Sequence, residues 1–281
     1  MAQDGSGPVH RGHAGAANLL STPRKLLVEN LFRASAGCPK ADAVCGCFAG
    51  LVDDETKRQA LDILSKVFPG AQLRAEPDYA AALSACGPRV DACVIAGTGS
   101  IVCSRSAGGL HKTGGRGPLL QDPGSAAEIG REVLSLILDD FQSVSIELRA
   151  SVEKNFGAAA SPELISRLYG AKSPAALMAK LVKPAAQEAT RGNSRVQGIL
   201  KTEMRSLAAM AVKHVSHFLS QKSTITVGLA GGLWRSHSVY VQMFSSEISN
   251  LMPSQMIDTF ILNTPPVEGA VSLAKEMLIG N

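Results

Sequence analysis

The chain has 281 residues, of which 45% are hydrophobic, so it can bury a large core and is expected to form one or two domains. Lys and Arg number 28 against 24 Asp and Glu, a small surplus that is scattered along the chain rather than gathered in a basic arm. The one Trp, three Tyr and eight Phe are too few to supply the stacking platforms that bind single-stranded nucleic acid. We therefore expect no nucleic-acid partner.

The sequence also lacks the signals of membrane insertion and secretion. No apolar run approaches the roughly 18 residues that indicate a membrane-spanning helix. The segment from Met1 to Arg11 is polar where a signal peptide would be apolar, so we expect a cytoplasmic protein without a membrane association. An organellar presequence stays open as an alternative, because Arg11, Arg24 and Lys25 outnumber the acid Asp4 in this region.

In chain order, strand-like apolar runs alternate with longer periodic segments, which is typical of an α/β fold. The first part of the chain predicts helix 24–34, strand 43–47, helix 53–67, strand 72–75, helix 79–85 and strand 92–96. The second part predicts strands 101–104 and 110–113, helix 126–138, a mostly helical stretch over 144–221, strand 224–229, helix 236–251, strand 256–262 and helix 268–278. Two α/β units joined by glycine-rich loops predict a cleft between two lobes.

Cysteine and histidine positions do not indicate a metal site. All six cysteines precede residue 104 and none forms a C-x-x-C pair, so reduced thiols in the core are expected. Cys45 and Cys47 alternate within a predicted strand and should point the same way. His214 and His217 lie three apart on a predicted helix and could share a metal, but no third ligand is placed beside them, which favours packing or surface histidines.

Three glycine-rich segments follow predicted strands and could bind phosphate. They are 97–100 (G-T-G-S), 114–125 with its G-G-R-G and D-P-G-S, and 228–232 with its A-G-G. Glycine lets successive backbone N–H groups converge on an anion, and a hydroxyl such as that of Thr98 or Ser236 can add a donor. Each segment alone is weak evidence, because ordinary turns are also rich in glycine. No Walker A or G-x-G-x-x-G motif occurs, so any nucleotide site is built differently.

The order of these motifs resembles the N-acetylglucosamine kinases, which belong to the actin-like sugar-kinase superfamily together with the BadF/BadG/BcrA/BcrD-type activator ATPases. The resemblance extends from Asn18 to the last helix and is most specific over 94–132. It implies an α/β, two-lobed actin-like (ribonuclease H-like) ATPase fold with an interlobe cleft. The N-terminal lobe would cover 1–97, with helix 268–281 packing back on it, and the C-terminal lobe would cover 98–267 with a helical insertion.

The resemblance also implies a function. This is ATP-dependent phosphorylation of an amino sugar, N-acetylglucosamine to its 6-phosphate, with ATP and Mg²⁺ as cofactors and a homodimer as one option. Asp78 matches the catalytic aspartate, which would accept the proton of the attacking sugar hydroxyl; the structural alternative is an N-cap for the helix that follows. The implied nucleotide-binding residues are Gly97, Thr98, Gly99, Gly231, Gly232 and Ser236. The implied sugar-binding residues are Asn18, Ser100, Gly115, Arg116, Gly117 and Asp122.

Two departures from the family pattern leave alternatives open. The family opens with a strand that ends in D-G-G-G-T and holds the phosphates, whereas residues 1–9 resemble the segment after it, so the first strand of the N-terminal lobe is expected to be missing. In the sugar loop, Arg116, Gln121 and Pro123 stand in place of tryptophan, glycine and glutamate. The alternatives are an impaired kinase homologue that binds a sugar or a protein partner, and an activator-type ATPase. Arg116 could favour an acidic substrate or simply be a solvated loop residue.

Overall fold

The computed structural model describes residues 1–4, 7–106, 108–120, 122–157 and 162–279. The chain divides into two compact units: unit 1 comprises Met1–Arg89 and Leu262–Asn281, and unit 2 comprises Val90–Ile261. The boundary expected from the sequence lies after residue 97, whereas β5 (Ala92–Ala96) hydrogen-bonds with strands of unit 2. Among the described helices, we find none with the length and hydropathy needed to cross a bilayer.

Unit 1 contains two separate pairs of strands. β1 (Ala2–Asp4) and β2 (Gly7–His10) are antiparallel, and β3 (Ala43–Phe48) and β4 (Gln72–Pro77) are parallel. The helices of this unit are α1 (Arg24–Ser35), α2 (Asp54–Val67), α3 (Asp78–Ala85) and α12 (Pro266–Ile279). α12 packs tightly on α3, since a Cβ on Gly269 would lie 2.0 Å from the carbonyl oxygen of Ala81.

A hollow of about 800 Å³ in unit 1 is lined by β1, β2 and β3 and by residues of α1, α2 and α12. Its lining is largely apolar and includes Val9, Leu31, Val44 and Val271. In the described part of the chain, neither strand pair gains a third strand.

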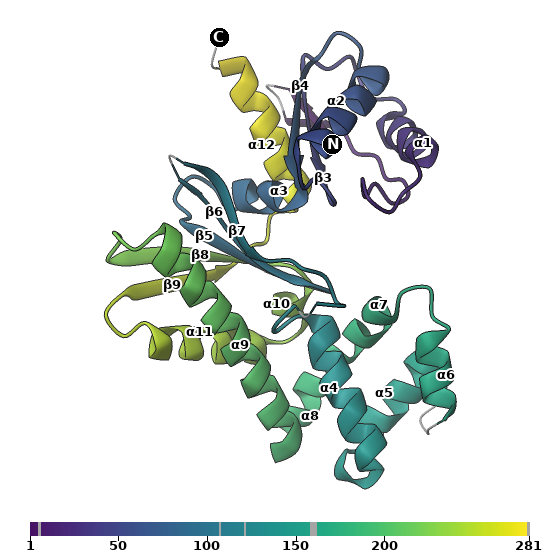
Figure 1. Cartoon of the computed structure of the whole chain (residues 1–281), viewed down its shortest axis with the longest axis vertical. Coiled ribbons are helices and arrows are strands. Elements are labelled where there is room, and N and C mark those ends of the chain that lie inside the picture. Colours follow the sequence, from purple (N-terminus) through teal and green to yellow (C-terminus); the bar gives the residue numbers. More distant parts are fainter. Residues whose placement is uncertain (5–6, 107, 121, 158–161, 280–281) are drawn as a thin grey trace. The chain divides into compact units, whose positions relative to one another are not determined.

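Unit 2 is built on a five-stranded mixed sheet in the order β7-β6-β5-β8-β9. β6 (Ser100–Ser106) and β7 (Gly109–Gly114) are antiparallel to their neighbours, while β8 (Thr224–Ala230) and β9 (Met256–Ile261) run parallel to β5. The long helix α9 (Ser194–Phe218) and α11 (Ser238–Leu251) pack side by side in this unit (Figure 1). Because β5 and β8 are parallel neighbours, the glycine turns that follow them lie at the same edge of the sheet.

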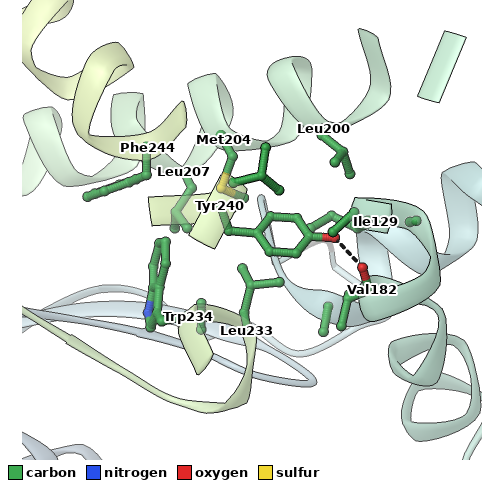
Figure 2. Close-up of a cluster of buried hydrophobic side chains, with 14 of the residues drawn as sticks. Ile129, Val182, Leu200, Met204, Leu207, Leu233, Trp234, Tyr240 and Phe244 are labelled. Carbon is green, nitrogen blue, oxygen red and sulfur yellow. Dashed lines mark hydrogen bonds between the residues drawn. The ribbon is translucent and has the colours of Figure 1, made fainter. Parts of the chain in front are cut away.

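The remaining helices of unit 2 surround a large apolar core. They are α4 (Ala126–Asp139), α5 (Ile146–Phe156), α6 (Glu163–Tyr169), α7 (Pro174–Met178), α8 (Val182–Thr190) and α10 (Gly232–Ser236), with 3₁₀ turns at Phe141–Ser143 and Ala179–Leu181. Figure 2 shows Tyr240 crossing this core, where its hydroxyl donates a hydrogen bond of 2.6 Å to the carbonyl oxygen of Val182. The same figure shows Trp234 and Phe244, whose rings pack with centroids 5.1 Å apart.

The predicted helices and strands are largely confirmed, whereas β1 and β2 were not among them. The predicted helix 236–251 corresponds to α11, which begins at Ser238, because His237 has extended backbone (φ −166°) and caps α11 with its side chain; the short helix α10 precedes it. Cys45 and Cys47 point the same way as expected, with sulfur atoms 3.8 Å apart. Asp53 caps α2 through a capping box with Thr56, which agrees with the acid-rich helix start seen in the sequence.

His214 is a buried packing residue of α9. Its Nδ1 lies 2.9 Å from the Thr113 hydroxyl and its Nε2 lies 2.8 Å from the Ser104 hydroxyl, so both ring nitrogens are hydrogen-bonded. The described residues contain no group of three His, Cys, Asp or Glu side chains arranged to hold a metal ion. Burial, with smaller contributions from His111 and His217, lowers the pKa of His214 to about 4.

This lowered pKa predicts a loss of stability in mild acid. Between the ordinary pKa of 6.5 and about 4, the unfolded chain takes up a proton on His214 and the folded chain does not. The free energy of unfolding should therefore fall by about 3 kcal/mol on this account as the pH drops through that window. Urea titrations of the parent and of His214→Asn should show a shallower decline in the variant.

The matched control is His217→Asn, since His217 is exposed on the same helix. This variant should retain most of the decline of the parent, because His217 makes only a small contribution to the lowered pKa of His214. Equal slopes for the parent and His214→Asn would contradict the assignment of the pH dependence to His214.

Candidate functional site

The second glycine-rich loop is organised around the carboxylate of Asp122. Its Oδ1 accepts hydrogen bonds from the backbone N–H groups of Arg116, at 3.0 Å, and Gly117, at 3.1 Å. Asp122 is only 4% exposed, and these two bonds offset the desolvation of its carboxylate. The acid predicted to bind sugar hydroxyls is thus held rigidly at a defined place in unit 2.

The Gly97–Ser100 turn closes directly against this carboxylate. A Cβ on Gly99 would lie 2.5 Å from Oδ2 of Asp122, so glycine is required for the approach. The Ser100 hydroxyl donates to the carbonyl oxygen of Pro123 at 2.7 Å, and the Ser100 carbonyl accepts the N–H of Gly115 at 2.9 Å. The carbonyl of Gly97 accepts the N–H of Ala126, the first residue of α4, at 2.7 Å.

These contacts join two loops that are separated in the sequence, and we call the result the Asp122 cluster. It brings together eight of the predicted site residues: Gly97, Thr98, Gly99, Ser100, Gly115, Arg116, Gly117 and Asp122. Thr98 is exposed at the tip of its turn. Gln121, which departs from the family pattern, lies outside the described residues.

The third glycine turn lies against the end of β5. Gly231 has φ +109°, and a Cβ there would lie 2.1 Å from the carbonyl oxygen of Ala96. A Cβ on Gly97 or Gly232, in contrast, would meet no atom within 4 Å. The edge of the sheet therefore combines one tightly packed glycine with two that face open space, where a ligand could approach the backbone. Ser236 ends α10, and its hydroxyl donates to the Leu233 carbonyl at 2.6 Å.

Two of the predicted site residues, Asp78 and Asn18, belong to unit 1. Asp78 is exposed in the first turn of α3, where the helix dipole favours its negative charge. The N-cap alternative for Asp78 is wrong: Pro77 is the cap residue, since the helix already begins at Asp78, whose Oδ1 accepts the N–H of Tyr79 at 2.9 Å. Asn18 uses its Oδ1 to accept N–H groups of its own turn, from Leu20 at 2.9 Å and from Ser21 at 3.2 Å.

Arg116 is exposed and lines a surface hollow of about 590 Å³ in unit 2. Lys112, Lys213 and His217 line the same hollow, and its described lining includes no acidic residue. The surface beside the Asp122 cluster is therefore positively charged and suits a ligand that carries a negative group.

Sequence reasoning missed the contribution of α9. Four residues along one face of this helix, Glu203, Leu207, Met210 and His214, contact the loops of the Asp122 cluster or the strand that leads into them. The carboxylate of Glu203 accepts the N–H of Gly124 at 2.8 Å. The available signal was an acid, Glu203, at helical spacing from apolar residues of the same helix. This pattern did not identify the residue that the acid contacts.

The geometry predicts that Gly99→Ala is destabilising. The new methyl group would push Asp122 away from its two amide donors, which should cost about 1 to 3 kcal/mol in the free energy of unfolding. Gly97→Ala is the matched control on the same turn, because its methyl group meets no atom within 4 Å. Denaturant titrations compare the two, and equal stability of both variants would contradict the proposed packing.

Known proteins resemble this chain in sequence and in fold. The sequence profile described as the BadF/BadG/BcrA/BcrD ATPase family matches residues 78–274. No curated protein sequence matches significantly.

Among solved structures, a candidate N-acetylglucosamine kinase from Chromobacterium violaceum is 23% identical, covers 96% of this chain and 92% of its own, and has a TM-score of 0.67. Its counterpart from Porphyromonas gingivalis is 18% identical, covers 94% and 90%, and has a TM-score of 0.72. A ROK family glucokinase from Streptomyces griseus, in complex with glucose and AMPPNP, is 16% identical, covers 91% and 90%, and has a TM-score of 0.59.

These likenesses confirm the predicted fold class, the α/β actin-like fold. The profile match covers well over half of the chain. It includes Asp78, the Asp122 cluster and the glycine turn at 228–232. The chain therefore belongs to the BadF/BadG/BcrA/BcrD ATPase family.

Proposed function

We propose that the chain is an ATP-dependent sugar kinase whose acceptor is an amino sugar, with N-acetylglucosamine converted to its 6-phosphate. The Asp122 cluster carries this proposal. Within it, a glycine turn of the kind that binds phosphate lies against a buried, rigid carboxylate of the kind that accepts hydrogen bonds from sugar hydroxyls. Phosphoryl transfer requires donor and acceptor to be fixed beside one another, and the cluster joins a candidate site for each.

The comparisons support this choice of reaction. Two of the similar structures are described as candidate N-acetylglucosamine kinases, and a third, a glucokinase, was solved with glucose and AMPPNP. The family description names an ATPase, which agrees with ATP as the phosphoryl donor. ATP would lie along Gly97, Thr98, Gly99, Gly231, Gly232 and Ser236, where the open space above Gly97 and Gly232 leaves room for it.

In unit 2, Asp122 would accept hydrogen bonds from sugar hydroxyls, with Ser100 and the 115–117 loop completing the contacts. In unit 1, the amide nitrogen of Asn18 would donate to the sugar. Asp78 would accept the proton of the attacking hydroxyl, whose oxygen forms a bond to the γ-phosphorus while the bond from that phosphorus to the β-phosphate oxygen breaks and ADP leaves.

Mg²⁺ fits this scheme as a partner of the nucleotide. The described residues offer no cluster of three ligating side chains, so phosphate oxygens and water would supply most of its ligands, as Mg²⁺ prefers. When bound, it would neutralise charge on the transferring phosphoryl group. Chelation with EDTA should therefore abolish turnover.

The role of Asp78 is tested by Asp78→Asn. Loss of the general base should lower kcat about 10²- to 10⁴-fold while the dissociation constant for N-acetylglucosamine changes little. Asp54→Asn is the matched control, since Asp54 is also an exposed acid in the first turn of a unit 1 helix. A coupled assay for ADP release measures the rate, and calorimetry measures sugar binding.

Three outcomes would redirect the assignment. Full turnover in Asp78→Asn would refute the general-base role. Sugar binding with no ADP release in the parent would favour an impaired homologue. The described residues of unit 1 fit that alternative in one respect, because the β1–β2 pair is not hydrogen-bonded to the β3–β4 pair. ATP hydrolysis that needs no sugar would favour an activator-type ATPase.

A further inference from the structure

Glu203 is a buried carboxylate with a single well-defined contact to the Asp122 cluster. It lies on α9, is 9% exposed, and its Oε2 accepts the backbone N–H of Gly124 at 2.8 Å. The two residues are 79 positions apart in the sequence. Burying a carboxylate is costly, so its placement here calls for an explanation beyond packing.

Gly124 is pressed onto α9 in a way that only glycine allows. It has φ +66°, and a Cβ there would lie 2.9 Å from the carbonyl oxygen of Glu203 and 2.5 Å from Cβ of Leu207. The hydrogen bond from its N–H thus fixes a backbone segment that is already in direct contact with the helix. Glu203 is the side chain that hydrogen-bonds this segment to the helix.

The position of Gly124 in turn constrains Asp122. The two residues are separated only by Pro123, and the Asp122 carbonyl accepts the N–H of Ser125 at 3.1 Å, which closes the turn around them. The Ser100 hydroxyl holds the Pro123 carbonyl from the opposite side of the turn. A shift of Gly124 would therefore move the Asp122 carboxylate relative to the two amides that it binds.

The charges around Glu203 come from α4. Glu128 and Glu132 raise the pKa of Glu203 in addition to the larger effect of burial, whereas the Gly124 N–H and Arg131 oppose that rise. Arg131 is itself paired with Glu128 and with Glu132, at 2.6 Å each. The N–H of Gly124 is thus the group that binds Glu203 directly, while Arg131 is shared with two other acids.

We propose that Glu203 is a positioning residue for the acceptor site: by holding Gly124, it fixes the carboxylate of Asp122 and, through it, the 115–117 loop. This inference rests on the proposed function, because Asp122 is assigned there to the sugar. Glu203 itself would touch neither substrate. Its effect should appear in binding of the acceptor rather than in the handling of ATP.

The test compares Glu203→Met with Glu203→Gln. Methionine keeps the length of the side chain but cannot accept the Gly124 N–H effectively, so the KM for N-acetylglucosamine should rise roughly tenfold or more, with the KM for ATP nearly unchanged. Glutamine retains an acceptor oxygen and should restore a KM close to that of the parent. Glu188→Met is the control, since it removes another buried acid of unit 2 that binds Ser145 and Asn193 rather than the site loops.

A second readout does not depend on activity. Amide hydrogen exchange measured by NMR should accelerate at Gly124, Arg116 and Gly117 in Glu203→Met, and should not accelerate there in Glu203→Gln or Glu188→Met. Unchanged exchange at Arg116 and Gly117 in Glu203→Met would overturn the proposal, as would equal KM values for the methionine and glutamine variants. Absence of sugar turnover in the parent would instead refute the proposed function and leave the exchange result to decide the role of Glu203.

Discussion

The candidate site in unit 2 depends on the burial of one carboxylate. Asp122 is removed from water, and a charge in that position is tolerated only where donors replace its hydration. The donors here are backbone N–H groups of residues 116 and 117, which forces the loop that carries them to turn toward the acid. The glycine turn at 97–100 must then lie close by without side chains in the way. One electrostatic requirement thus determines the shape of two loops.

The platform for those loops is the long helix α9. Its residues 203, 207, 210 and 214 repeat at helical spacing: the first two contact Gly124, the third contacts Gly114 and the fourth contacts Thr113. A helix is stiff along its axis, so points fixed to it keep their mutual distances. The mixed sheet contributes the other half of the support, since the parallel pair β5 and β8 places two glycine turns at one edge.

Much of this fold was predictable from local signals. The helix over 53–67 and the helical character of 144–221 follow from the periodicity of their apolar residues; within the second stretch, Gly157, which has φ +73°, ends α5. Apolar runs located β3 and β4 of unit 1 and all five strands of unit 2, but not β1 and β2. The motif order also identified the eight residues that meet in the Asp122 cluster, because the family resemblance covers that stretch.

Other features depend on contacts between distant residues, and local patterns do not encode them. The pairing of Glu203 with Gly124 and the hydroxyl partners of His214 arise only when α9 packs against the loops. The break at His237 was hidden because residues on both sides are compatible with a helix, and it is the extended backbone there that separates α10 from α11. The helix start at Asp78 depends on the preceding proline, which cannot supply the N–H that an interior helix position needs.

The packing of α12 on α3 has a consequence for the way the protein forms during synthesis. Unit 2 is one continuous stretch of chain, but unit 1 needs its first 89 residues and its last 20 together. On the ribosome, the first of these parts is made before unit 2 and the second part after it. The contact of Gly269 with Ala81 can form only after unit 2 has been made. The part of unit 1 that precedes unit 2 in the chain therefore completes its packing after unit 2, and its apolar surface stays uncovered until α12 has been synthesised.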